Sequence, residues 1–165
     1  MKINKKIIIL LSLLFIVLLL LSCSSESSPE NKEVIFAVEK LFQAIADHDS
    51  AQAASVLLPG AAIYSVRKDS SSTEWNSTAS EDFIRGLASS EEQWLERMWD
   101  PKVLIHKQIA VVWAPYDFHR NQQFSHGGID AFNLIKTEGG WKIASAMYTV
   151  EPENFTDSPL GKPEY

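Results

Sequence analysis

His126 and Asp130, in the second half of the chain, have the chemistry needed for proton transfer or for orienting a ligand. An imidazole titrates near neutral pH, and a carboxylate in an apolar pocket can act as a general base. Four residues span about 13 Å along an extended strand and return to the same face, so both side chains can line one pocket at different depths. They could touch only if the strand bends, and the Gly127-Gly128 pair between them is typical of such a bend.

Tyr116 and Tyr148 could assist this pair, because a phenol can donate a hydrogen bond to a developing oxyanion. A structural role is the alternative. His126 would then fix the end of a strand, and Asp130 would accept hydrogen bonds from backbone amides or from an arginine such as Arg97. The sequence leaves both interpretations open.

We expect no metal and no cofactor. Asp117 and His119 could join His126 and Asp130 as ligands, but their spacing fits no zinc pattern and the chain has a single cysteine. No serine lies in a Gly-x-Ser-x-Gly elbow, and no glycine-rich loop leads from a strand into a helix to hold phosphates.

Aromatic side chains are available to line a cavity, since the sequence has five Trp, four Tyr and eight Phe. Residues 94–99 combine two tryptophans with charged side chains. They form either a rim that selects a planar ligand by stacking or the amphipathic start of a strand. The complete set of predicted ligand-binding residues is Trp99, Trp113, Tyr116, His126, Asp130, Phe132 and Tyr148.

The first half of the domain is predicted to hold three helices. Ser28-Pro29-Glu30 is typical of a helix start, because a hydroxyl caps the helix and proline suits its first turn. Apolar residues then form one stripe as far as Ile45. A second helix is predicted over residues 51–58, ended by Pro59-Gly60. After a strand over residues 61–67 and a polar, turn-rich stretch over residues 69–77, a capping box at residues 78–81 is expected to start the third.

Beyond residue 92 the apolar residues follow the two-residue period of strands. Strands are predicted over residues 103–105, 109–114, 124–136 and 141–150, with a hairpin turn at Gly139-Gly140. Helices followed by long strands predict an α+β domain, in which three helices pack on one face of a strongly curved antiparallel sheet. The side chains expected in its core or pocket wall are Trp113, Phe132, Leu134, Trp141 and Ile143.

This order of elements resembles the nuclear transport factor 2-like cone fold. Three stretches are more specifically similar to the lumazine-binding branch of that superfamily, and more loosely to its polyketide-cyclase-like members: IAVVWAPY at 109–116, FSHGGIDAF at 124–132, and GWKI at 140–143 with Tyr148-Thr149. The resemblance covers about residues 32–151 and implies a cone-shaped domain. Cone folds include isomerases, dehydratases, cyclases and non-catalytic binders, so the resemblance alone does not imply a reaction.

The N-terminal segment is predicted to be a signal peptide. Three lysines precede an apolar run over residues 7–21, which would reach about 22 Å as a helix, short of the ~30 Å hydrocarbon layer. Leu-Leu-Ser-Cys at residues 20–23 resembles the lipobox of bacterial lipoproteins, which implies that residues 1–22 are removed and that Cys23 is acylated. A simple secretory signal or an uncleaved anchor is the alternative.

These features predict a polar tether over residues 23–29, a domain over residues 30–151 and an irregular tail over residues 152–165. The resemblance implies a position in the cell envelope, held by the acyl chains on Cys23. Without an aspartate after Cys23, the outer membrane is expected where the organism has one. The net charge is −6, and loss of the three signal-peptide lysines makes the mature chain more acidic. We therefore expect no nucleic-acid partner.

Three functions remain open. The first is a membrane-tethered, non-catalytic domain that binds a small apolar or planar ligand. The second is an enzyme of the isomerase or dehydratase type that uses Asp130 and His126. The third is an interaction module that forms a homodimer through its sheet. A deep aromatic pocket would favour the first, a buried carboxylate with a raised pKa the second, and a broad exposed apolar sheet face the third.

Overall fold

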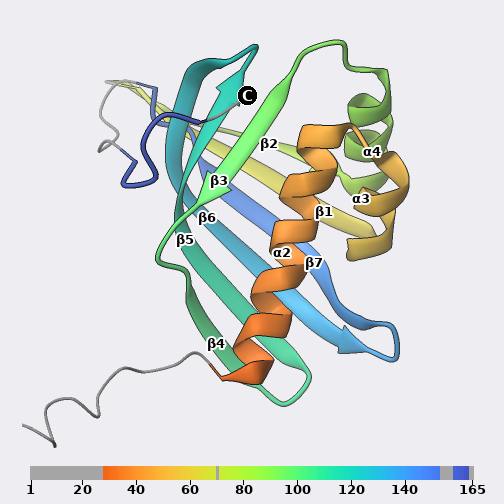
Figure 1. The fold of residues 1–165 in the computed structure, drawn as a ribbon. Helices are drawn as coiled ribbons and strands as arrows, with labels where there is room; N and C mark the ends of the chain where they lie inside the picture. Colours follow the sequence, from red (N-terminus) through yellow and green to blue (C-terminus); the bar gives the residue numbers. More distant parts are fainter. Residues whose placement is uncertain (1–27, 70, 153–157, 164–165) are drawn as a thin grey trace, which may run out of the picture.

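A computed structural model describes residues 28–69, 71–152 and 158–163. The predicted signal peptide, the predicted acylation site Cys23 and most of the predicted tether lie outside the described residues. Within them, three helices pack against one face of a curved sheet of seven strands (Figure 1). The α+β cone architecture predicted from the sequence is confirmed. No helix in the described ranges is long and apolar enough to cross a membrane.

Helix α2 (Pro29–Asp47) begins where the sequence predicts it. The side chain of Ser28 accepts a hydrogen bond from the backbone N–H of Asn31 at 3.1 Å, and Pro29 occupies the first turn. Helix α3 (Ser50–Val56) is shorter than predicted. Leu57 already belongs to a strand, where it pairs with Ile143, so sheet pairing ends the helix before Pro59-Gly60.

Helix α4 (Ser80–Ser89) lacks the predicted capping box, since Ala79 is its N-cap and no side chain caps it. The residues of the expected box bind strand β1 (Leu57–Lys68) instead. Ser80 donates to the carbonyl of Leu58 at 3.2 Å, and a Glu81 carboxylate oxygen accepts from the N–H of Gly60 at 2.8 Å. These contacts fix α4 over the end of the sheet.

The sheet has the order β2-β1-β7-β6-β5-β3, and β4 also pairs with β5. The remaining bounds are Thr73–Ala79 for β2, Trp94–Met98 for β3, Lys102–His106 for β4, Ile109–Arg120 for β5, Gln123–Thr137 for β6 and Gly140–Thr149 for β7. The pairing is antiparallel except between β1 and β7, which run parallel. The predicted all-antiparallel sheet is therefore corrected to a mixed one.

Strand β2 was not expected, because its sequence is polar and rich in turn-forming residues. It pairs along β1 from Ala62–Ala79 to Lys68–Thr73 and forms one edge of the sheet. An edge strand that faces solvent on both sides needs no alternating apolar pattern, so its backbone hydrogen bonds define it. At the opposite edge, β3 accounts for residues 94–98, which makes the strand interpretation of that cluster correct.

The register of strand β6 shifts beside His126, and not at the glycine pair where a bend was expected. Phe118 pairs with His126 and His119 with Phe124, so Ser125 is the additional residue. Gly128 has another role. Its φ of +152° and the closeness of the Thr149 carbonyl and hydroxyl oxygens leave no room for a Cβ atom.

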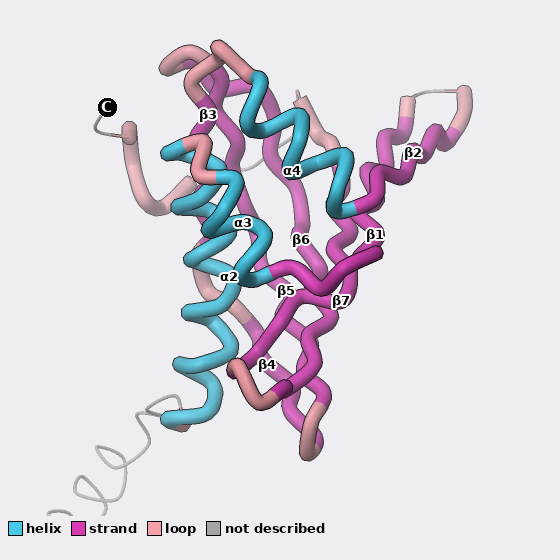
Figure 2. Tube along the Cα trace, turned by 90° about the vertical axis from the view of Figure 1, so that its right-hand side faces the viewer, coloured by secondary structure: helices cyan, strands magenta, loops and turns pink. Residues whose placement is uncertain are grey.

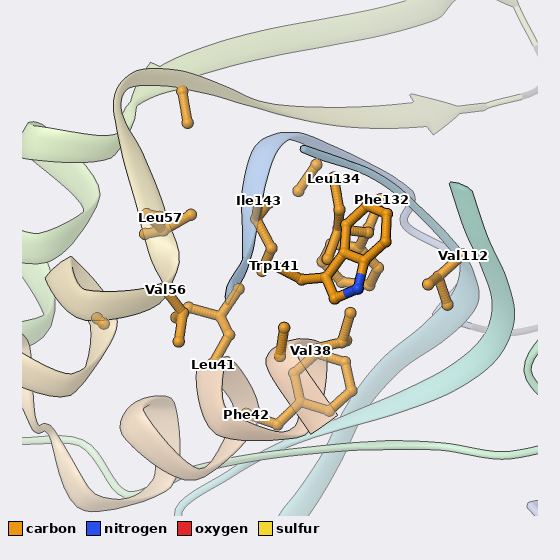
Figure 3. Close-up of a cluster of buried hydrophobic side chains, with 14 of the residues drawn as sticks. Val38, Leu41, Phe42, Val56, Leu57, Val112, Phe132, Leu134, Trp141 and Ile143 are labelled. Carbon is orange, nitrogen blue, oxygen red and sulfur yellow. The ribbon is translucent and has the colours of Figure 1, made fainter. Parts of the chain in front are cut away.

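The hydrophobic core lies between helix α2 and the concave face of the sheet (Figure 3). Four of the five predicted residues are buried, namely Phe132, Leu134, Trp141 and Ile143. The prediction for Trp113 is wrong, because this side chain is 53 % exposed on the convex face. Its neighbours Val112 and Ala114 face the helices and are fully buried, so strand alternation turns Trp113 outward.

Candidate functional site

A cavity of about 470 Å³ lies between the concave face of the sheet and helices α2 and α4. Figure 2 shows the three helices gathered on one side of the curved strands. Most of the cavity wall is apolar or aromatic, and this part comprises Leu41, Phe42, Ile45, Ile63, Phe83, Leu87, Trp94, Phe118, Phe132 and Ala146. The polar lining includes Glu96, Tyr116, His126, Asp130 and Tyr148. This combination is typical of a small-molecule site.

The central polar feature of the cavity is a pair of carboxyl groups, Glu96 from β3 and Asp130 from β6. A side-chain hydrogen bond joins them. Asp130 is only 2 % exposed. Glu96 is partly exposed as a whole residue on an edge strand, but its carboxyl group is enclosed. Two carboxyl groups can form a hydrogen bond only when one of them is protonated, so the pair shares a proton.

Burial is the main cause of the raised pKa values in this pair. It raises the pKa of Glu96 from 4.5 to about 7, and the charge of Asp117 adds to that rise. The pKa of Asp130 is raised well above 3.8 by burial and by the neighbouring charge of Glu96. Because Asp130 donates its proton to the Glu96 carboxylate, the pair keeps a proton at neutral pH where ordinary carboxyl groups would be ionised.

The two tyrosine hydroxyls at the cavity already bind protein groups. Tyr116 donates to the backbone carbonyl of Thr149 at 2.7 Å, and the Tyr148 hydroxyl bonds with Ser65 on the neighbouring strand. Burial raises the pKa of both tyrosines, and the acid pair raises them further. Both phenols therefore remain protonated and firmly held.

His126 is neutral at physiological pH. Burial, with the nearby charges of Arg67 and Arg120, lowers its pKa from 6.5 to about 4. Its ring stacks on Tyr148, with centroids 6.5 Å apart and planes inclined by 25°, and lies 5.1 Å from the ring of Phe118. Its Nδ1 is 3.0 Å from the Ser125 hydroxyl. The imidazole thus forms part of an aromatic wall.

Five of the seven predicted ligand-binding residues line the cavity: Tyr116, His126, Asp130, Phe132 and Tyr148. Whether they contact a ligand stays a prediction. Trp113 lies on the convex face, and Trp99, just beyond the end of β3, is half-buried outside the cavity lining. The lining tryptophan is Trp94 instead.

Sequence reasoning missed Glu96 as a site residue, although a signal was present. Trp94, Glu96 and Met98 alternate along one short strand, and the two apolar members pack against the core. A strand face that is buried at both apolar positions also directs the carboxylate between them inward. A strand was one of the two alternatives for residues 94–99, and the sequence did not show which of its faces points inward.

Asp117 lies on the opposite face of β5 and is the true partner of Arg97. The guanidinium donates from Nε to Oδ1 at 2.9 Å and from Nη2 to Oδ2 at 2.6 Å. Nη2 also donates to the Gly161 carbonyl at 3.0 Å, which holds the C-terminal segment against this face. The suggested ion pair between Arg97 and Asp130 is therefore incorrect. Among the described residues, no group of three or more His, Cys, Asp or Glu side chains is placed to hold a metal ion.

The fold and cavity define a cone-shaped domain of the nuclear transport factor 2-like class, and solved structures agree. A member of this superfamily from Salmonella enterica serovar Typhimurium has a TM-score of 0.60 and 13 % identity, over 84 % of this chain and all of that one. A similar protein from Cytophaga hutchinsonii has a TM-score of 0.62 and 13 % identity, over 74 % of this chain and 99 % of that one. Identities this low show the fold alone.

The family follows from the sequence. The model of the family described as "Putative lumazine-binding" matches residues 29–149, and the chain belongs to this family. A comparison with curated proteins gave no match.

Proposed function

We propose that this domain binds a small, planar and largely apolar molecule in the cavity and holds it without changing it chemically. The observation that carries the proposal is the aromatic-walled cavity of about 470 Å³, whose polar lining includes an acid pair. A volume of this size suits a small organic ligand, and a few converging polar groups fix its orientation. The family to which the chain belongs is described as lumazine-binding, which supports a ligand-binding role.

A cavity-filling substitution tests this proposal. Ala146 lines the cavity from β7, and Ala131 on β6 lies on the other face, paired with Met147. Ala146→Leu should reduce the occupancy of any molecule that co-purifies, measured by native mass spectrometry, and should weaken binding of 1-naphthalenemethanol in a calorimetric titration. Ala131→Leu makes the same change on the opposite face of the sheet. It should leave the occupancy of the co-purifying molecule and the affinity for 1-naphthalenemethanol unchanged. Equal binding by two folded variants would place the site elsewhere.

Proton transfer is the second candidate function, because a buried carboxyl group with a raised pKa is typical of acid–base catalysis. The geometry favours Glu96 over His126 as the partner of Asp130, since those two carboxyl groups share a hydrogen bond. Incubation with 1-indanone in D₂O separates the two functions. Deuterium incorporation next to the carbonyl group, above the buffer rate and lost in Asp130→Asn, would establish catalysis. A bound but unexchanged ketone would support simple binding.

The convex face of the sheet supports a further proposal, that two copies of the domain pair through this surface. Trp113, Ala131 and Met147 form one row across β5, β6 and β7, and Leu104 pairs with Val111 beside it. The large side chains here are exposed, including Leu104 at 72 %. Contiguous exposed apolar surface is typical of an interface.

Sedimentation velocity tests this pairing. Trp113→Glu should convert a dimer to a monomer, because a charge at the centre of an apolar interface is left without a partner. Phe36→Glu alters an equally exposed aromatic residue on α2 and should leave the dimer intact. A wild-type protein that sediments as a monomer at every concentration would exclude the pairing.

We also propose that Cys23 anchors the domain to a membrane of the cell envelope. The basic residues, apolar run and lipobox-like sequence before Cys23 support this proposal. Cys23→Ala should abolish lipid labelling and leave the precursor unprocessed. A processed Cys23→Ala protein that still partitions into detergent would contradict acylation at this residue.

A further inference from the structure

The acid pair in the cavity includes a buried oxygen atom that has no hydrogen-bond donor from the described part of the chain. This atom is the Oδ2 of Asp130, to which no N–H or O–H group in the described residues donates. The Tyr116 hydroxyl, which could have donated, is committed to the Thr149 carbonyl. A buried carboxyl oxygen without a hydrogen-bond partner carries a desolvation cost, which a ligand with a hydrogen-bond donor can offset.

The other charges at the cavity do not compensate for this pair. Asp82 also lines the cavity, but it is exposed and forms an ion pair with Arg85 at 2.6 Å, and Arg120 is the only arginine or lysine among the described lining residues. Arg120 lies at the exposed edge and donates from Nε to Glu92 at 2.9 Å, with its side chain 51 % exposed. His126 is neutral, and helix α2 contributes only the apolar side chains of Leu41, Phe42 and Ile45.

We propose that the ligand carries a protonated nitrogen, an ammonium or amidinium group, on a planar apolar body, and that this cation binds at Glu96 and Asp130. This inference rests on the proposed ligand-binding function. The cation donates to the carboxylate oxygens, the aromatic rings of Tyr116, Phe118 and Tyr148 receive the apolar body, and the proton shared by the pair passes to the solvent. An anionic ligand would instead meet two buried acids.

A matched series of naphthalene probes tests the choice of head group. We expect 1-naphthylmethylamine to bind tighter than 1-naphthalenemethanol by about tenfold to a hundredfold, the usual range for a charge-assisted hydrogen bond. 1-Naphthoate should not bind measurably. Calorimetry at pH 6.5 in two buffers of different ionisation enthalpy should show proton release when the amine binds.

Two variants locate the effect. Glu96→Gln and Asp130→Asn should each remove the preference for the amine over the alcohol and abolish proton release, while the alcohol still binds. Glu39→Gln removes a carboxylate exposed on α2 and should change neither result. Folding of each variant is checked by its thermal melting curve.

The outcomes separate this inference from the function on which it rests. If none of the naphthalene probes binds to the folded protein, the proposed cavity function fails and the cation site fails with it. If the alcohol binds but the amine binds no tighter, ligand binding stands and the cationic head group is excluded. A preference for the amine that persists in both Glu96→Gln and Asp130→Asn would place the cation elsewhere.

Discussion

Glu96 on β3 and Asp130 on β6 are separated in the sheet by strand β5, yet a hydrogen bond joins their carboxyl groups. In a flat sheet, strands two positions apart lie about 10 Å from each other. The curvature of this sheet brings the concave faces of its edge and its centre together. Two acids from distant parts of the chain therefore share one proton inside an apolar cavity.

This pairing predicts an unusual pH dependence of stability. Burial holds the pKa of Glu96 at about 7 in the folded protein, above its ordinary value of 4.5. Between these pH values the folded state binds more protons than the unfolded state, so the free energy of unfolding should fall as the pH rises. Glu96→Gln should show a shallower decline, since only Asp130 then contributes to it, and should be more stable than the wild type by about 1–3 kcal/mol at pH 8, measured by urea denaturation.

His126 affects the pH dependence of stability in the opposite direction to Glu96, so the two contributions must be separated. Its pKa is lowered from 6.5 to about 4, so its contribution to stability is lost as the pH falls through that interval. The test is therefore the difference in the free energy of unfolding between Glu96→Gln and the wild type, measured at each pH. Glu39→Gln, with an exposed carboxylate removed, should follow the wild-type curve. Identical pH dependence in Glu96→Gln and the wild type would contradict a raised pKa at Glu96.

The ion pair between Arg97 and Asp117 should contribute strongly to folding. Asp117 is 2 % exposed, and Arg97 holds both of its carboxylate oxygens. Arg97→Leu should lower the free energy of unfolding by about 3–5 kcal/mol, because it leaves a buried charge without its partner. The double variant Arg97→Leu with Asp117→Leu should recover part of that loss. A single variant as stable as the wild type would show that solvent reaches Asp117.

Gly128 should not tolerate a side chain. Its φ of +152° and the oxygens of Thr149 exclude a Cβ atom, so Gly128→Ala should lower the melting temperature sharply or prevent folding. Gly139→Ala is the control, since a Cβ atom there would meet only flexible side chains, the nearest at 3.6 Å. Equal melting temperatures for the two variants would refute the constraint at Gly128.

Trp141 should be among the most important core residues. It is 5 % exposed within the cluster of Figure 3. Trp141→Ala should cost about 3–5 kcal/mol, a large part of the ~5–15 kcal/mol that stabilises a domain. Trp75→Ala removes a tryptophan that is 70 % exposed on β2 and should cost about 0.5 kcal/mol or less. Chemical denaturation of both variants checks the contrast.

The sequence by itself determined the helices and the long strands, because these depend on local signals. Ser28 caps α2 at the predicted residue, and the apolar stripe of that helix faces the core. Alternation along residues 124–136 placed His126, Asp130 and Phe132 on one face, and all three line the cavity. Strand β2 escaped prediction because an exposed edge strand carries no apolar alternation.

Tertiary structure alone decided the partners of the charged residues. Nothing local distinguishes Asp117 from Asp130, but β5 turns Asp117 to the convex face, where Arg97 binds it. Asp130 forms its hydrogen bond with Glu96 instead. A strand was one alternative for residues 94–99, but the sequence did not show that Glu96 points inward. Trp113 was expected in the core but lies on the convex face. Strand β5 has apolar residues on both of its faces, so its sequence does not reveal which face meets the helices. Sheet curvature and pairing register settle these contacts, and both depend on residues far apart in the chain.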